Sequence, residues 1–377
     1  MSRRTSTLLG ACFASVLALG CGATFDAATE IKSLRILGVQ KDKPYALPGE
    51  KVNLSLLWYD ATDAGTTEPP RPVQIRWLGG CLNPPADSYQ GCFAEYAAAL
   101  TEPTAPFAAG FSQGSGATFS VTMPTDATAG PFGPVLHPSQ DLQLGPYGLS
   151  YVFFSVCAGT LVPAPSDKQF PLRCVDDNGT DLGPNDFVLG YTAIYMFGPP
   201  PGGGVYRNAD PVIGGFNFGQ KDVTDAACFG DDCLGTCAVD PASHEITGCF
   251  NKTDPADIDC DLWPSLCIPS CKDDGDQLKC PKHEISLSID PHTFEQDQVT
   301  NDAYSKMYLE QMWIDYYSTA GKFKSGTKLL NDATTGWNNE NFTDFFAPSA
   351  TGLARVWVVV HDNRGGVSWA GTTLKIQ

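Results

Sequence analysis

Hydrophobic and polar residues alternate along short stretches of this chain, and the clearest is residues 50–59. There Val52, Leu54, Leu56 and Trp58 fall on one face, with the two-residue period of a half-buried β-strand. Similar stretches, separated by turns rich in Gly and Pro, occupy residues 31–39, 73–78, 117–123, 149–157, 187–197, 211–218, 284–289, 311–317, 353–361 and 367–376. Only residues 92–100 are a candidate for a helix. The pattern therefore predicts an all-β protein.

A run of Pro and Gly at residues 198–204 interrupts the strands near the middle of the chain. Pro lacks the backbone donor and Gly loses much entropy on folding, so this run continues neither a strand nor a helix. A length of 377 residues also fits two domains. We expect a first β-sandwich over 31–197, a linker over 198–208 and a second β-sandwich over 209–377. Each half exceeds the roughly 100 residues of a simple sandwich, so the surplus is expected in long loops over 81–116, 124–145 and 222–281.

The end of the chain carries a motif of extracellular modules. Residues 354–361 are rich in Val, residues 362–366 have the turn sequence Asp-Asn-Arg-Gly-Gly, and a final strand follows. This pattern resembles the closing hairpin of Ig-like and PKD-type domains, and residues 48–52 are similar to their early turn. The resemblance implies two tandem Ig-like β-sandwiches, the second with a disulfide-rich loop insertion. A fold of this kind does not specify a function.

The N-terminus has the features of an export signal. Arg3 and Arg4 precede an apolar run over residues 8–20, which is too short to span a bilayer. Residues 17–21, Leu-Ala-Leu-Gly-Cys, resemble the lipobox of bacterial lipoproteins, in which the Cys receives a diacylglycerol. The resemblance implies a signal peptide over 1–20, lipidation at Cys21 and a tether over 21–30. Gly22 in place of Asp implies the outer membrane, facing either the periplasm or the surface; the alternative is a plain signal peptide.

The cysteines support an exported protein. The chain has 14 Cys; Cys12 would leave with the signal peptide and Cys21 would carry lipid. The remainder is an even number, as expected of disulfides formed in an oxidising compartment. These residues are Cys81, Cys92, Cys157, Cys174, Cys228, Cys233, Cys237, Cys249, Cys260, Cys267, Cys271 and Cys280. Pairing each cysteine with its nearest neighbour in the sequence predicts the disulfides Cys81–Cys92 and Cys157–Cys174. The pairing of the last eight cysteines stays open.

Those eight cysteines lie in an acidic insertion over 222–281. Residues 222–280 hold 12 Asp and one Glu against three Lys, whereas the whole chain has a net charge of −18. One interpretation is that carboxylates keep a segment without a hydrophobic core soluble. The other is a Ca²⁺ site, because Asp257, Asp259 and Asp261 alternate as carboxylate ligands of calcium loops often do; residues 273–276 are a second candidate. Zinc is disfavoured, because the short Cys spacings are C-x₃-C.

No catalytic motif stands out. Residues 110–114 match G-x-S-x-G, but they lie in a Gly/Ser-rich loop without the strand and helix that a nucleophile elbow needs. The five His form no H-E-x-x-H, and no phosphate-binding or dinucleotide motif occurs. We therefore assign no catalytic residue and no cofactor other than the candidate Ca²⁺. An acidic chain with few charged residues also makes a nucleic-acid partner unfavourable.

These observations favour a non-catalytic lipoprotein of the cell envelope, acting in binding, adhesion or envelope structure. It would contact the membrane only through its lipid and would have an unknown protein or glycan partner. A first alternative is a carbohydrate-binding module, in which a sugar would stack on Trp313, Tyr316, Tyr317 and Trp337. The competing interpretation of Trp313 is a core residue of the sandwich. Tyr316 and Tyr317 are expected on opposite faces of their strand. A second alternative is a secreted hydrolase with catalytic residues on loops. An exposed row of aromatic residues across one sheet would favour glycan binding. A pocket lined by carboxylates with shifted pKa values would favour the hydrolase.

Overall fold

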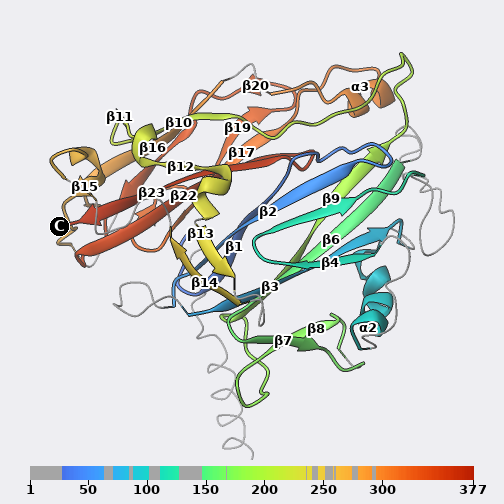
Figure 1. Cartoon of the computed structure of the whole chain (residues 1–377). Coiled ribbons are helices and arrows are strands. Elements are labelled where there is room, and N and C mark those ends of the chain that lie inside the picture. Colours follow the sequence, from blue (N-terminus) through green and yellow to red (C-terminus); the bar gives the residue numbers. More distant parts are fainter. Residues whose placement is uncertain are drawn as a thin grey trace, which may run out of the picture.

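The computed structural model describes residues 28–62, 71–84, 88–101, 111–126, 147–166, 168–234, 236–239, 245–250, 258, 260–273, 279–290 and 294–377, without the side chains of 236–239 and 245–250. Within these ranges the fold is nearly all-β and contains several antiparallel sheets (Figure 1). The all-β fold class is therefore confirmed. The one helix expected, over 92–100, is present as α2 (Phe93–Thr101).

Two sheets are built mainly from the first half of the chain. A three-stranded sheet has the order β1 (Leu34–Lys41), β2 (Lys51–Asp60) and β5 (Thr118–Thr122). A six-stranded sheet has the order β13 (Thr236–Val239), β14 (Glu245–Phe250), β3 (Val73–Leu82), β6 (Tyr147–Cys157) and β9 (Phe187–Phe197), with β4 (Ser112–Ser115) also paired to β3. Beside it lie the hairpin of β7 (Thr160–Pro163) and β8 (Leu172–Val175), the short helix η2 (Tyr89–Cys92) and α2.

Two further sheets come from the second half. A five-stranded sheet has the order β11 (Lys221–Asp222), β10 (Ile213–Phe218), β16 (Lys282–Ile289), β21 (Phe342–Phe346) and β18 (Lys322–Phe323). A seven-stranded sheet has the order β12 (Cys228–Phe229), β23 (Val367–Ile376), β22 (Gly352–Asp362), β17 (Met312–Ser318), β19 (Thr327–Asp332) and β20 (Gly336–Trp337), with β15 (Cys267–Ile268) also on β23. The helices of this half are η3 (Thr224–Ala226), η4 (Gly230–Leu234), η6 (Pro264–Leu266) and α3 (Gln298–Tyr304).

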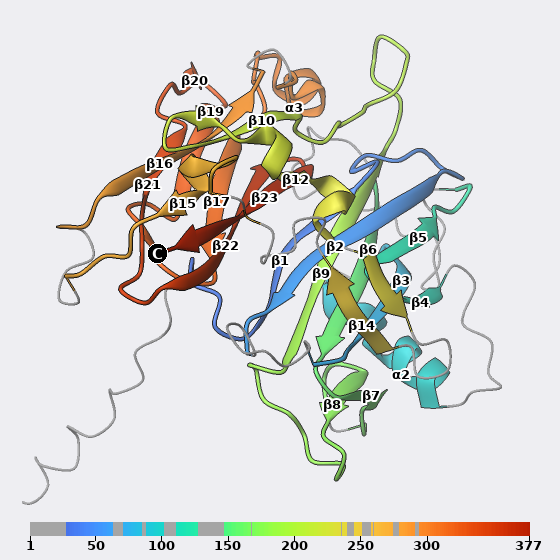
Figure 2. The same ribbon diagram turned by 60° about the vertical axis from the view of Figure 1, so that its left-hand side comes forward.

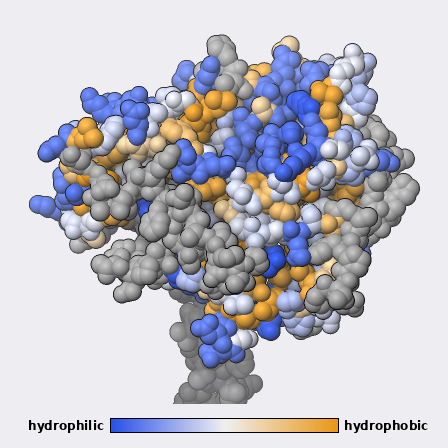
Figure 3. All heavy atoms as spheres, viewed as in Figure 1, coloured by the Kyte–Doolittle hydropathy of each residue, from blue (hydrophilic) through white to orange (hydrophobic). Residues whose placement is uncertain are grey.

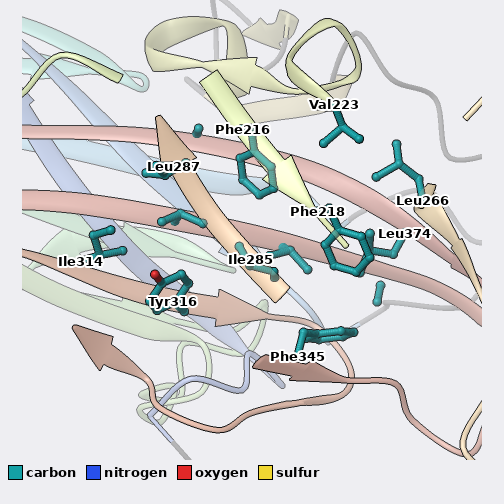
Figure 4. Packing of buried hydrophobic residues seen from close by; sticks show 14 of the residues in the cluster. Phe216, Phe218, Val223, Leu266, Ile285, Leu287, Ile314, Tyr316, Phe345 and Leu374 are labelled. Carbon is teal, nitrogen blue, oxygen red and sulfur yellow. The ribbon is translucent and has the colours of Figure 1, made fainter. Parts of the chain in front are cut away.

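A hydrophobic core lies between the two sheets of each half. In the first half, Val52 and Leu54 of β2 pack with Trp77 of β3, and all three are almost fully buried. In the second half, the five-stranded and seven-stranded sheets enclose the residues of Figure 4, among them Phe216, Leu287 and Tyr316. The alternation in the sequence therefore places one face of each strand in a core.

A third core joins the two halves. The β-bulge in β1 lets both Leu37 and Gly38 face the seven-stranded sheet, where Leu37 packs with Trp357 and Trp369. A Cβ atom on Gly38 would lie 3.3 Å from the Trp369 ring, so the missing side chain allows a close approach. The three-stranded sheet is thus covered on both faces, and β1 and β2 lie between the sheets of the two halves (Figure 1).

The cysteine-rich insertion is tied to both halves. Its hairpin β13–β14 extends the six-stranded sheet of the first half, with Ile246 opposite Val73 (Figure 2). Its strands β12 and β15 pair with β23 of the second half, and the Trp369 indole N–H donates to the Gly230 carbonyl at 2.6 Å. The insertion, expected as a loop, therefore contributes main-chain hydrogen bonds to two sheets.

Disulfides connect cysteines that are close in sequence. The bonds Cys81–Cys92 and Cys157–Cys174 are those expected from nearest neighbours. Within the insertion the structure resolves the open pairing in part, with Cys228–Cys233, Cys260–Cys267 and Cys271–Cys280. Cys237 and Cys249 lie in β13 and β14, and their side chains are outside the described part.

Candidate functional site

Aromatic side chains gather on the outer face of the six-stranded sheet. Tyr151 and Phe153 of β6 alternate with core residues and so point away from the three-stranded sheet, as does Tyr191 of β9, which lies opposite Phe153. Along part of this face α2 and β8 cover the sheet and form a separate buried cluster around Phe153. Tyr191 and its neighbour in the same row, Leu189, stay 47% and 48% exposed.

A second tyrosine from a distant part of the chain completes this surface. Tyr89 of η2 is 37% exposed and stacks on Tyr191, with ring centroids 4.6 Å apart and planes 16° from parallel. Tyr151 meets Tyr191 edge-on at 5.4 Å. We call the surface formed by Tyr89, Tyr151, Leu189 and Tyr191 the tyrosine face. Offset-stacked and edge-to-face pairs are the favoured arrangements of aromatic rings, so the rings hold one another in place.

Three local features fix the tyrosine face. The Cys81–Cys92 disulfide fastens η2 to β3. Phe93, the first residue of α2, packs its ring on Phe153 at 5.2 Å and meets the Tyr89 ring edge-on at 6.3 Å. Gly190 leaves room for Phe154 on the inner side of β9, since a Cβ there would lie 2.7 Å from the Phe154 ring. The exposed rings are therefore mounted on elements that a disulfide and ring packing hold against the six-stranded sheet.

The chemistry of the tyrosine face is aromatic and uncharged. Its polar atoms are three phenol oxygens, and the Gln90 amide beside it donates to the Tyr89 hydroxyl at 3.4 Å. Such a surface offers flat apolar rings and neutral hydrogen-bonding groups together. A ligand with apolar C–H faces and hydroxyl groups matches that combination.

The aromatic platform expected in the second half does not form. Tyr316 is fully buried in the core, and Trp337 packs against the same core. Tyr316 and Tyr317 do lie on opposite faces of β17, as predicted. The expectation that Trp313 is a core residue is wrong: Ile314 and Tyr316 face the core, and one step along the strand turns Trp313 to the other face, where it stacks on His361 at 5.2 Å.

The calcium interpretation is not tested by the described residues. Asp257 and Asp259 lie outside them, as do residues 274–276 of the second candidate, whereas Asp261 is described and exposed. Among the described residues, no group of three or more His, Cys, Asp or Glu is arranged to hold a metal ion.

The predicted signal peptide and the predicted lipidation site Cys21 also lie outside the described residues. Among the helices that the structure describes, none has the length and apolar character needed to span a bilayer.

Ser112 of the G-x-S-x-G match lies in β4, at the side of β3. The next element is the strand β5 and not a helix. The local structure therefore differs from a nucleophile elbow, in agreement with the sequence interpretation.

A buried charged cluster at the junction of the two halves was not anticipated. Arg364, in the turn between β22 and β23, is 5% exposed; it pairs with Glu310 and donates to Glu295 at 2.7 Å. Burial raises the pKa of the Glu310 carboxyl, and Arg364 opposes that rise. Asp362 accepts hydrogen bonds from the backbone N–H of Arg364 at 2.7 Å and from the Asn208 amide at 3.0 Å. The turn sequence Asp-Asn-Arg-Gly-Gly was the available signal for this cluster.

The same cluster reaches into the first half. Lys41 of β1 is 3% exposed and donates to the Thr192 hydroxyl at 2.8 Å. Burial lowers the pKa of Lys41 to about 8, and burial raises the pKa of the nearby Asp210 to about 7. Asp210 accepts from the Val367 backbone N–H at 3.0 Å. Ion pairs and hydrogen bonds of this cluster therefore connect residues of the two halves across the junction.

Comparisons with known proteins give no relative. No family model matches the chain, and no curated protein matches it. Among solved structures, dimeric latent PorU from Porphyromonas gingivalis aligns at 8% identity with a TM-score of 0.17, over 92% of this chain and 24% of that one. The three N-terminal domains of the outer capsid protein Hoc of bacteriophage RB49 align at 7% identity with a TM-score of 0.16, over 92% and 99%. Neither likeness bears on the fold or the function.

Proposed function

We propose that this protein is a non-catalytic, lipid-anchored binding protein of the cell envelope that holds an uncharged saccharide on its tyrosine face. The observation that carries the proposal is the stacked pair of Tyr89 and Tyr191, which remains exposed at the outer face of the six-stranded sheet. Pyranose rings present flat C–H surfaces that pack on aromatic rings, and their hydroxyl groups pair with phenols and amides. Rings fixed in advance also lose little entropy on binding.

A hydrolase is less well supported by the same structure. The carboxyls of Asp210 and Glu310 have raised pKa values, as catalytic acids often do. Both, however, lie in the buried charged cluster between the two halves. There Arg364 pairs with Glu310, and the Val367 backbone N–H donates to Asp210. Binding without catalysis is the function that fits these roles.

Attachment to the outer membrane through Cys21 remains part of the proposal, based on the lipobox resemblance. Cys21→Ala should abolish incorporation of a labelled fatty acid and move the protein from the membrane fraction to the soluble fraction of the envelope. Unchanged labelling and membrane association would contradict the lipoprotein assignment. This measurement is independent of the saccharide test.

Saccharide binding is tested by affinity electrophoresis of the mature chain in native gels that contain hydroxyethylcellulose, xylan or mannan. We expect retardation in at least one gel and an association constant at least fivefold lower for Tyr191→Ala and Tyr89→Ala. Tyr304→Ala is the matched control, because Tyr304 is 38% exposed but lies on α3. No retardation in any gel, or equal retardation of all variants, would reject the saccharide proposal.

A further inference from the structure

The edge of the six-stranded sheet along β9 has unpaired main-chain groups. Tyr195 turns its N–H and C=O away from β6, where they bond to the segment 44–46 at 3.1 and 2.9 Å. In an antiparallel strand every second residue points its main-chain groups to the same side, so Leu189, Tyr191 and Ala193 do likewise. Within the residues that the structure describes, these three make no main-chain hydrogen bond on that side. We call the edge formed by these three residues the open edge.

Soluble proteins usually protect a sheet edge with charged side chains, Pro, a bulge or a very short strand, and β9 has none of these. Its residues include no charge and no Pro, and its register against β6 has no bulge. The edge strand β1, in contrast, carries Arg35, Lys41 and a bulge, and the five-stranded and seven-stranded sheets end in strands of two residues. With 11 residues, β9 is also longer than any other edge strand that the structure describes.

Apolar side chains lie beside these main-chain groups. Hydrophobic residues occur among hydrophilic ones on the face seen in Figure 3, so an exposed apolar side chain does not by itself mark a binding site. At the open edge, however, Leu189 and Tyr191 are about half exposed and also present unpaired N–H and C=O groups. A ligand that pairs with the main chain here therefore also covers apolar surface.

The chain itself closes both ends of the open edge. The segment 44–46 lies beside Tyr195 at one end, and at the other the Phe187 N–H donates to the Gly183 carbonyl at 3.0 Å. Antiparallel pairing of two copies of β9 around Tyr191 would place Phe187 of each copy against the segment 44–46 of the other. The space between the two ends therefore suits a short extended peptide and not a second copy of β9.

We propose that the open edge binds a short extended peptide segment of another protein as an added antiparallel strand. An extended main chain offers donors and acceptors at the spacing of Leu189, Tyr191 and Ala193. Antiparallel pairing is how β9 already pairs with β6, and it is slightly more stable per residue than parallel pairing. The peptide residues opposite these three then direct their N–H groups to β9 and their side chains to the side of Leu189 and Tyr191, so we expect them to be apolar and uncharged. This binding does not depend on the saccharide proposal.

Fluorescence anisotropy of the mature chain with a labelled peptide of sequence Thr-Val-Thr-Val-Thr-Val-Thr tests the proposal. We expect saturable binding, with the three Val opposite Leu189, Tyr191 and Ala193. N-methylation of the three Val removes the N–H groups that face β9 and should weaken binding at least tenfold. N-methylation of the two central Thr, whose N–H groups face solvent, should change binding less than twofold.

On the protein side, Ala193→Pro removes one N–H of the open edge and no hydrogen bond to β6, so it should weaken binding of the unmethylated peptide at least fivefold. The matched control is Thr122→Pro in the edge strand β5, which should bind normally. There the Met123 N–H donates to the Glu50 carbonyl beside β2, so Thr122 turns its own N–H away from that strand.

No binding of the peptide, equal binding of the two methylated peptides, or equal effects of the two Pro variants would overturn the proposal. A dimer in sedimentation that Ala193→Pro dissociates would also overturn it, because a second copy would then occupy the open edge. If Ala193→Pro does not fold, the methylated peptides still decide, since they are measured on the unmodified chain.

Discussion

Arg364 and Glu310 form an ion pair in which both residues are almost fully buried, at the junction where the two halves of the chain meet. The pair has further partners, because Glu310 accepts from the Glu295 backbone N–H at 2.9 Å and Arg364 also pairs with Glu295. The Arg364 guanidinium lies 5.9 Å from the centre of the Tyr45 ring. A turn of the last hairpin is thus connected to residues from both halves.

Arg364→Met should destabilise the protein by about 3–5 kcal/mol, because it leaves the Glu310 carboxylate buried without its cation. Urea unfolding measures the loss. The double variant Arg364→Met, Glu310→Gln should recover part of it, since the uncompensated charge is then removed. A loss below about 1 kcal/mol in the single variant would show that this pair does not hold the junction.

Asp210 should make the stability fall as the pH rises. Burial raises its pKa from 3.8 to about 7 in the folded protein, so between these values the folded state holds the proton more tightly than the unfolded state. The contribution of Asp210 is then most favourable below pH 3.8 and is lost as the pH rises through 7. Asp210→Asn should flatten this part of the curve of melting temperature against pH. An unchanged slope would contradict the assignment.

Lys41 should make the stability rise with pH in a higher range of pH. Its pKa is lowered from 10.5 to about 8, so between these values the unfolded state binds more protons and stability rises with pH. Lys41→Met should remove this rise between pH 8 and 10.5, as followed by thermal unfolding. Lys322→Met, at an exposed lysine, should leave it in place.

The close approach of β1 to the seven-stranded sheet depends on Gly38. Gly38→Val should cost about 1–3 kcal/mol of stability, because its side chain would crowd Trp369 and Val359. The matched control is Gly183→Ala, where a new Cβ meets nothing within 4 Å. Equal unfolding midpoints in urea for the two variants would show that the junction accommodates the added atoms.

The sequence predicted the strands because one apolar face per strand leaves an alternating pattern, as in β2. The Val-rich run that the sequence shows over residues 354–361 lies in β22, which has Val358 in one core and Trp357 and Val359 in another. The sequence did not reveal which sheet covers the second face of the three-stranded sheet. That contact depends on the bulge at Leu37 and on the space left by Gly38, neither of which changes the hydrophobic pattern.

The candidate sites were less predictable than the strands. Tyr89 and Tyr191 are far apart in the sequence and meet where the Cys81–Cys92 disulfide fastens η2 to the sheet. The hairpin β13–β14 joins β3 through main-chain hydrogen bonds, which any residue except Pro can form and which leave little trace in the sequence. The sequence offered an aromatic platform only as an alternative, at Trp313 and its neighbours, and did not indicate the exposed pair of Tyr89 and Tyr191.

The Cys81–Cys92 disulfide should support both stability and the tyrosine face. Cys81→Ser with Cys92→Ser opens a short loop and should cost about 2–4 kcal/mol. It should also weaken retardation in the polysaccharide gel, because Tyr89 is then no longer fastened to β3 beside Tyr191.

The control for that variant is Cys157→Ser with Cys174→Ser, which opens a comparable loop at the other end of the sheet. It should lose a similar amount of stability in urea and keep its retardation, since β6 and β9 still present Tyr151 and Tyr191. If both double variants lose retardation equally, the effect of the first reflects general loosening of the sheet. If neither loses it, Tyr89 does not need its covalent tie to bind saccharide.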